Sequence, residues 1–89
     1  MKYKLNEIEY TLEKNEKDGF VYEEVKNKYT DYFEKYDYVF GDWAYGKLRL
    51  KGFYDSKNKN VKDLNDIENL EKYIDANCAY NCKWFLLKK

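Results

Sequence analysis

Basic and aromatic side chains gather in one short stretch of this sequence, and together they could bind an anionic or flat ligand. Three cations alternate along one predicted strand, a phenylalanine follows them on the same face, and two more rings precede them. Cations and flat rings on an open sheet are typical of single-stranded nucleic-acid binders, because cations hold phosphates while rings stack on bases. The candidate binding residues, for a protein or RNA partner, are Trp43, Tyr45, Lys47, Arg49, Lys51 and Phe53.

The same pattern also suits the solvated polar face of an antiparallel sheet. On that interpretation the basic residues pair across strands with Glu7, Glu9 or Glu13. Arg49 is the only arginine beside sixteen lysines, and its guanidinium can form two parallel hydrogen bonds where an ammonium cannot. If this basic-aromatic face does bind a ligand, that ligand could be nucleic acid, a protein or a small anion.

Two thiols lie four positions apart, at Cys78 and Cys82, where a helix is expected to end. Two thiols without histidine cannot form a closed zinc site within one chain, although a homodimer could share four thiolates. The spacing also differs from the two-residue gap of thioredoxin-type motifs. We therefore predict no metal, and expect both cysteines to be small buried side chains where the helix meets the last strand.

Acidic residues are the remaining candidates for catalysis. Asp37, Asp42 and Asp55 bracket the central hairpin, and neighbouring carboxylates could do acid–base work or bind Mg²⁺. No phosphate-binding loop or nucleophile motif accompanies them, and aspartate beside glycine usually belongs to a turn. The chain has no histidine, which excludes Ser-His, Cys-His and His-metal sites. We predict no catalytic residue, no cofactor and a non-enzymatic function.

Length and composition indicate one cytoplasmic domain, residues 1–89. Aromatic residues make up 20% of the chain, which lets a small core bury a large area. The 17 acidic and 17 basic residues balance, so no net field recruits nucleic acid or a membrane. No apolar run approaches the roughly 20 residues of a membrane span, and the N-terminus does not resemble a signal peptide.

The first half of the chain predicts a hairpin, a helix and a strand. Alternating residues favour strands at 3–5 and 8–14 around a turn at Asn6 and Glu7, or else one bent strand. Apolar side chains at helical spacing predict a helix over 22–35, with Asp18 as its cap. A strand over 37–42 leads into a tight connection over 41–46, where glycine supplies the positive φ angles.

The second half predicts a strand, a helix and a last strand. Alternation favours a strand over 47–54. Asn65 and Glu68 have the form of a capping box, and the last strand is expected over 83–87. One side of the helix between them carries Ile67, Leu70, Tyr73, Ile74 and Cys78.

The element order β(β)-α-β-β-α-β predicts an α+β fold. We expect two layers, a four- to five-stranded and mainly antiparallel sheet packed by two helices on one face. The order matches the ferredoxin-like plan. Another two-layer α+β topology stays open, because the strand order is not visible in a sequence.

The segment GDWAYGKLRLKGFYD, residues 41–55, resembles the signature of the YutD-like family. These are small, functionally uncharacterised proteins of low-GC Gram-positive bacteria and their relatives. The segments at 18–20 and 35–38 and the cysteine pair before the aromatic last strand also fit. The resemblance spans nearly the whole chain and implies a cytoplasmic domain of helices and strands, but no activity, cofactor or catalytic residue. The leading hypothesis is a binding or regulatory module with an exposed basic-aromatic sheet face, and the alternative is an accessory subunit or homo-oligomer that binds no nucleic acid.

Overall fold

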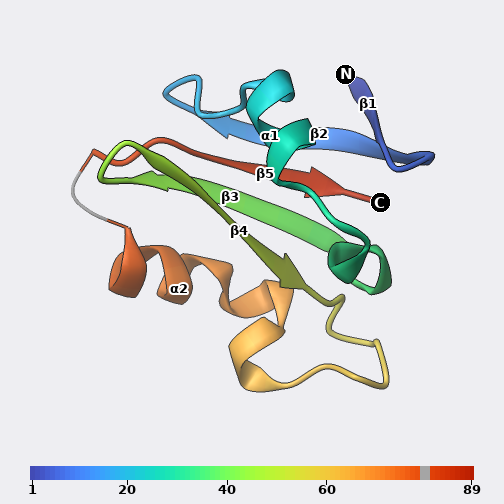
Figure 1. Cartoon of the computed structure of the whole chain (residues 1–89). Coiled ribbons are helices and arrows are strands. Elements are labelled where there is room, and N and C mark those ends of the chain that lie inside the picture. Colours follow the sequence, from blue (N-terminus) through green and yellow to red (C-terminus); the bar gives the residue numbers. More distant parts are fainter. Residues whose placement is uncertain (79–80) are drawn as a thin grey trace.

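A computed structural model describes residues 1–78 and 81–89 of the chain. In this described part of the chain, five antiparallel strands form one sheet, and two α-helices pack against it (Figure 1). The strands are β1 (Lys2–Leu5), β2 (Ile8–Glu16), β3 (Tyr38–Ala44), β4 (Lys47–Phe53) and β5 (Trp84–Lys88). The helices are α1 (Tyr22–Lys28) and α2 (Leu70–Asn77), with 3-10 turns at Asp31–Lys35, Asp63–Asn65 and Ile67–Asn69. The predicted α+β class, with a mainly antiparallel sheet of four to five strands and two helices, is confirmed.

The strand order is β1-β2-β5-β3-β4, which differs from the ferredoxin-like plan. Every neighbouring pair in this sheet is antiparallel, so it has no parallel pair of the βαβ kind. The last strand takes the central place because its residues Phe85, Leu86 and Leu87 are all buried. A strand that is apolar on both faces is stable only between neighbours and beneath cover on both sides.

The two helices cover opposite faces of the sheet, where we expected both on one face (Figure 1). Phe85 and Leu87 of β5 belong to the core cluster that contains Val25 of α1. Leu86 points the other way, into the cluster that contains Phe53 of β4 and packs beneath α2. The sheet face that carries Phe53 is therefore covered, and the open face predicted from the sequence does not exist there.

The first predicted helix is interrupted in its middle. The α-helix ends at Lys28, Tyr29 is extended with ψ 136°, and a separate 3-10 turn follows. Tyr29 leaves the helix in a conformation that brings its hydroxyl 2.7 Å from that of Tyr10 in the core. Asp18 does not cap α1, because it lies in a turn with φ 56° and Val21 occupies the cap position.

Both hairpins close with two-residue turns of positive φ. The first turn lies at Asn6 and Glu7, as predicted. In the second, β3 continues to Ala44, and the turn is Tyr45–Gly46 with φ angles of 54° and 75°. Gly41, expected in the connection, lies within β3, where a Cβ atom would come 2.1 Å from the ring of Phe85.

The segment before α2 is capped one residue later than predicted. The Asp66 side chain accepts from the Glu68 amide at 2.9 Å, whereas Asn65 accepts from the Lys62 amide at 2.7 Å. The predicted apolar side of this region is confirmed, because its residues pack against the second core cluster. No helix in residues 1–78 and 81–89 is long and apolar enough to cross a membrane.

Candidate functional site

The six candidate binding residues all lie on the β3–β4 hairpin, but on different sides of the sheet. Tyr45 and Lys47 are exposed at the turn. Trp43 is half-buried against the cluster on the α1 side, and its Nε1 donates to the Gly19 carbonyl at 2.7 Å. Phe53 is buried beneath α2. The structure therefore separates the rings that we expected to form one platform.

Arg49 binds a buried carboxylate on the neighbouring strand. Its cross-strand partner is Asp42, which is 1% exposed. Arg49 Nε donates to Asp42 Oδ1 at 3.0 Å, and its Nη2 donates both to Oδ2 and to the Asn77 carbonyl of α2, the latter at 3.1 Å. This pairing raises the pKa of Arg49, chiefly through the hydrogen bonds to Asp42. The only arginine of the chain therefore does form two parallel hydrogen bonds, but it forms them with Asp42 of the same chain and not with a ligand.

The sequence predicted Asp42 at the end of a strand and the start of a tight connection, whereas it lies inside β3 (Tyr38–Ala44). The sequence did contain a signal for its role. If Tyr45–Gly46 is taken as a two-residue turn, Asp42 and Arg49 must face each other across the hairpin. Among the described residues, the glutamates proposed as partners form no ion pair with these basic residues, and Glu9 Oε1 instead lies 3.7 Å from Lys2 Nζ.

Lys51 is also held by the fold. Its Nζ lies 5.0 Å from the ring centroid of Phe53 and 5.3 Å from that of Tyr73 on α2. Burial lowers the pKa of this amine. With Arg49 paired and Lys51 half-buried, the alternating cations do not form a free row of positive charge.

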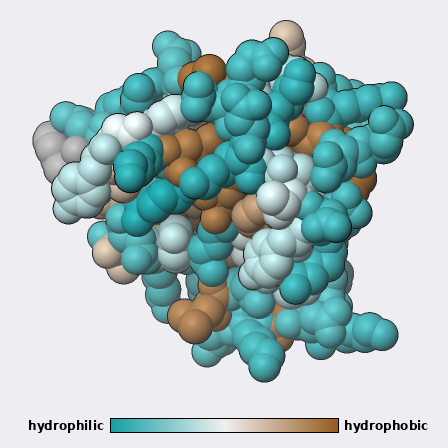
Figure 2. Space-filling model, in the orientation of Figure 1, coloured by the Kyte–Doolittle hydropathy of each residue, from teal (hydrophilic) through white to brown (hydrophobic). Residues whose placement is uncertain are grey.

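A groove lies beside the tip of the hairpin, between β3–β4 and α1. Its volume is about 280 Å³. Above the Trp43 ring, Lys83 Nζ lies 5.4 Å from the ring centroid. The face viewed in Figure 1 is mostly hydrophilic, with apolar atoms near its centre (Figure 2). The residues that line the groove are Glu24, Asn27, Lys28, Trp43, Gly46, Lys47 and Leu48.

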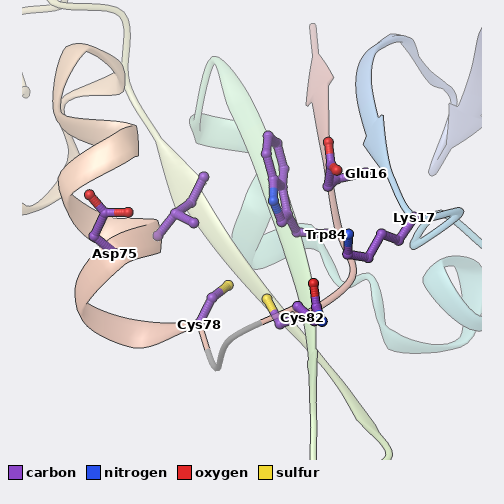
Figure 3. Close-up of a pocket in the computed structure, with 8 residues that line it drawn as sticks. Glu16, Lys17, Asp75, Cys78, Cys82 and Trp84 are labelled. Carbon is purple, nitrogen blue, oxygen red and sulfur yellow. The ribbon is translucent and has the colours of Figure 1, made fainter.

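Two thiols complete a cluster around Asp42. Cys78 ends α2, Cys82 precedes β5, and both are free and half-buried. Cys78 Sγ donates to Asp42 Oδ2 at 3.2 Å, and burial followed by hydrogen bonding to Cys82 raises the pKa of the Cys78 thiol. The two sulfur atoms point toward each other beside a pocket (Figure 3). Their setting is more polar than the apolar joint that the sequence predicted.

Comparisons with known proteins agree along almost the whole chain. Residues 4–88 match the family model "Putative antitoxin YutD-like". The chain is 44% identical over 85 residues to "Putative antitoxin YutD" of Bacillus subtilis (strain 168), which covers 96% of this chain and 93% of that protein. It also resembles the solution NMR structure of protein yutD from B. subtilis, with a TM-score of 0.82, 42% identity, and coverage of 99% of this chain and 80% of that one. The resemblance found in the sequence is thus confirmed, and the chain belongs to the YutD-like family.

Proposed function

We propose that this chain is a cytoplasmic binding module that docks a protein partner through the tip of the β3–β4 hairpin. The tip consists of Tyr45, the half-buried Trp43 and Lys47. The remaining candidates, Arg49, Lys51 and Phe53, support the hairpin from beneath, through their contacts with Asp42 and α2.

The observation that carries this proposal is the position of Tyr45. Its relative exposure is 104%, so the fold gains no burial from a ring of this size. Its φ of 54° is left-handed, a conformation that costs a residue with a side chain about 1 kcal/mol and that favours Asn or Gly. The left-handed backbone costs free energy and the exposed ring recovers none by burial, so a contact with another molecule is the best explanation for a tyrosine at this position. Tyrosine is among the residues enriched in binding hot spots.

The charges around the tip favour a protein over RNA. Single-stranded nucleic-acid sites need several free cations along the backbone path, whereas Arg49 is paired and Lys51 is half-buried. The net charge of the chain is +0. Lys47 lines the groove together with Trp43, and Lys83 Nζ lies over the Trp43 ring. The partner that fits is a protein with an apolar pocket for the ring and carboxylates at the rim.

The family comparison is consistent with a function based on binding. The B. subtilis relative is named "Putative antitoxin YutD". A toxin protein is therefore one kind of partner that we propose for this chain.

The test is a tagged pull-down from native lysate with the wild-type chain, Tyr45→Asn and Tyr45→Phe, each with and without RNase. Asn tolerates the left-handed conformation, so Tyr45→Asn should fold normally but lose at least about 30-fold in affinity for its protein partner. Tyr45→Phe should retain most of the binding. Leu64→Asn, which removes another exposed apolar side chain (84% exposed), should have no effect.

Three results would contradict the proposal. The first is undiminished capture of the same protein by Tyr45→Asn. The second is partners that disappear with RNase and whose binding weakens steeply with salt, as phosphate contacts do. The third is recovery of only further copies of this chain, which would support the alternative of a homo-oligomer.

A further inference from the structure

We propose that Asp42, Cys78 and Cys82 form a binding site for a zinc-like divalent cation. The three residues come from β3, from the end of α2 and from the segment before β5. One ligand atom from each, a carboxylate oxygen and two sulfurs, lies within 4.8 Å of the other two. Two sulfurs bound to one tetrahedral zinc lie about 3.8 Å apart, given zinc–sulfur bonds of ~2.3 Å. Small side-chain rotations are enough to close the cluster around an ion.

The donor set fits zinc better than the hard cations. Thiolates select zinc and other soft or borderline metals, whereas magnesium and calcium need oxygen ligands. Asp42 provides the third ligand that the sequence alone did not supply. Because it is buried and fixed, it reaches the thiols without a change in the backbone.

Arg49 could have blocked this site, but its geometry leaves the needed oxygen free. A carboxylate offers about four lone-pair positions, and Arg49 occupies one on each oxygen of Asp42. Asp42 Oδ2 keeps a second position, which now accepts from the Cys78 thiol at 3.2 Å. An ion would replace this thiol proton between the same two atoms. Arg49 would then orient the liganding carboxylate from behind, as outer partners do at metal sites.

The charges balance with and without the ion. In the metal-free site the charges of Asp42 and Arg49 cancel. Binding of a divalent cation releases two thiol protons, so two thiolates offset the two new positive charges. No buried charge is left uncompensated in either state.

Three protein ligands leave one tetrahedral position open, as in catalytic zinc sites. Cys78 and Cys82 also line a pocket of about 430 Å³ (Figure 3). Glu16, Lys17, Asp75 and Trp84 also line this pocket. Water or a donor atom from another molecule can complete the coordination. This inference does not depend on the proposed role of Tyr45.

The test is a titration of the reduced chain with Co²⁺, followed by displacement with Zn²⁺, under anaerobic conditions. We expect one Co²⁺ per chain, with a sulfur-to-cobalt charge-transfer band that one equivalent of Zn²⁺ abolishes. Cys82→Ser should weaken binding at least 100-fold. Asp42→Asn should weaken it by a similar factor, and Arg49→Lys by about 10- to 100-fold. Asp75→Asn, a matched control in the same pocket, should bind normally.

Circular dichroism and mass measurements on each variant separate loss of the site from loss of the fold. Several results would overturn the proposal: no charge-transfer band at millimolar Co²⁺ with the thiols still reduced, a 1:2 complex in which two chains share four thiolates, or unchanged affinity in folded Asp42→Asn. Ready conversion of the cysteines to a disulfide by a small disulfide oxidant, without metal uptake by the reduced form, would also overturn it.

Discussion

Asp42 and Arg49 show how far one pair of residues can be predicted from a sequence. The capacity of the lone arginine for two parallel hydrogen bonds was visible, but its partner was not. That partner depends on the hairpin register, and the predicted strand ended at Asp42 instead of continuing to Ala44, so the pairing of Asp42 with Arg49 was missed. The basic face was misjudged for a different reason, because side-chain alternation shows which residues share a face but not what covers it.

The two members of this pair should respond differently to substitution. Arg49→Ala leaves the buried Asp42 carboxylate without its counter-charge, which should lower the free energy of unfolding by about 3 kcal/mol. Asp42→Asn should cost only about 1–2 kcal/mol, because the Arg49 side chain is 46% exposed and can turn toward water. Urea denaturation of both variants measures the difference. Equal losses, or a larger loss for Asp42→Asn, would contradict the proposed burial of the carboxylate.

Lys51 should contribute packing rather than charge. Its folded-state pKa is lowered by burial, so at neutral pH the folded chain holds the charged amine at a cost relative to the unfolded chain. Lys51→Met keeps the apolar stem over Phe53 and Tyr73 and removes that cost. We expect an equal or higher free energy of unfolding, against no change for the matched variant Lys47→Met on the same strand. A clear loss in Lys51→Met alone would show that the charge stabilises the fold.

At the scale of elements, local patterns predicted the strands well and the helices less well. Alternation and short apolar runs located the strands to within a few residues, and the apolar run of β5 is buried at Phe85, Leu86 and Leu87. The first helix was predicted too long, since its apolar spacing continues through a 3-10 turn. The break at Tyr29 comes from a tertiary contact, the hydroxyl pair with Tyr10, which no local pattern encodes.

Gly41 offers a test of how closely β3 packs on β5. A Cβ atom there would lie 2.1 Å from Phe85 Cζ, so Gly41→Ala should lower the free energy of unfolding by about 1–3 kcal/mol through overpacking. Adding Phe85→Leu should recover part of that loss, because it removes the ring that clashes. A thermal-melt cycle over the two single variants and the double variant gives the coupling. Strict additivity would contradict direct contact between these positions.

At the scale of the whole molecule, the sequence predicted the class of fold but not its layers. Helices on opposite faces follow from the double-sided burial of β5, and that burial depends on β5 lying in the centre of the sheet. Strand order is set by long-range pairing, so it was not accessible from the chain alone. The tyrosine-rich composition, by contrast, does predict how the stability of the whole molecule depends on pH.

The chain should lose stability between pH 10 and 12. Burial raises the pKa of Tyr36 to about 12, and it also raises the pKa values of Tyr10 and Tyr29. Over this range the unfolded chain releases tyrosine protons near its ordinary pKa of about 10, while the folded chain retains them. The contribution of these tyrosines to the free energy of unfolding is therefore fully present below pH 10, and it is lost as the pH rises toward their folded-state pKa values.

Tyr10→Phe removes one of these groups. It should cost about 1 kcal/mol at pH 7 through the lost hydrogen bond to Tyr29, yet show a shallower fall above pH 10. Urea midpoints measured across the range test both parts. A slope identical to that of the wild-type chain would contradict burial of the Tyr10 hydroxyl.

The most direct test of docking through the hairpin tip is site-specific photocrosslinking in cells. A benzophenone amino acid is placed at Tyr45 or, as a control, at the exposed Lys59 in the loop before α2. After irradiation and RNase treatment, mass spectrometry identifies the adducts. We predict one defined protein adduct from position 45 and none from position 59. No protein adduct from position 45, or the same adducts from both positions, would contradict docking through this tip.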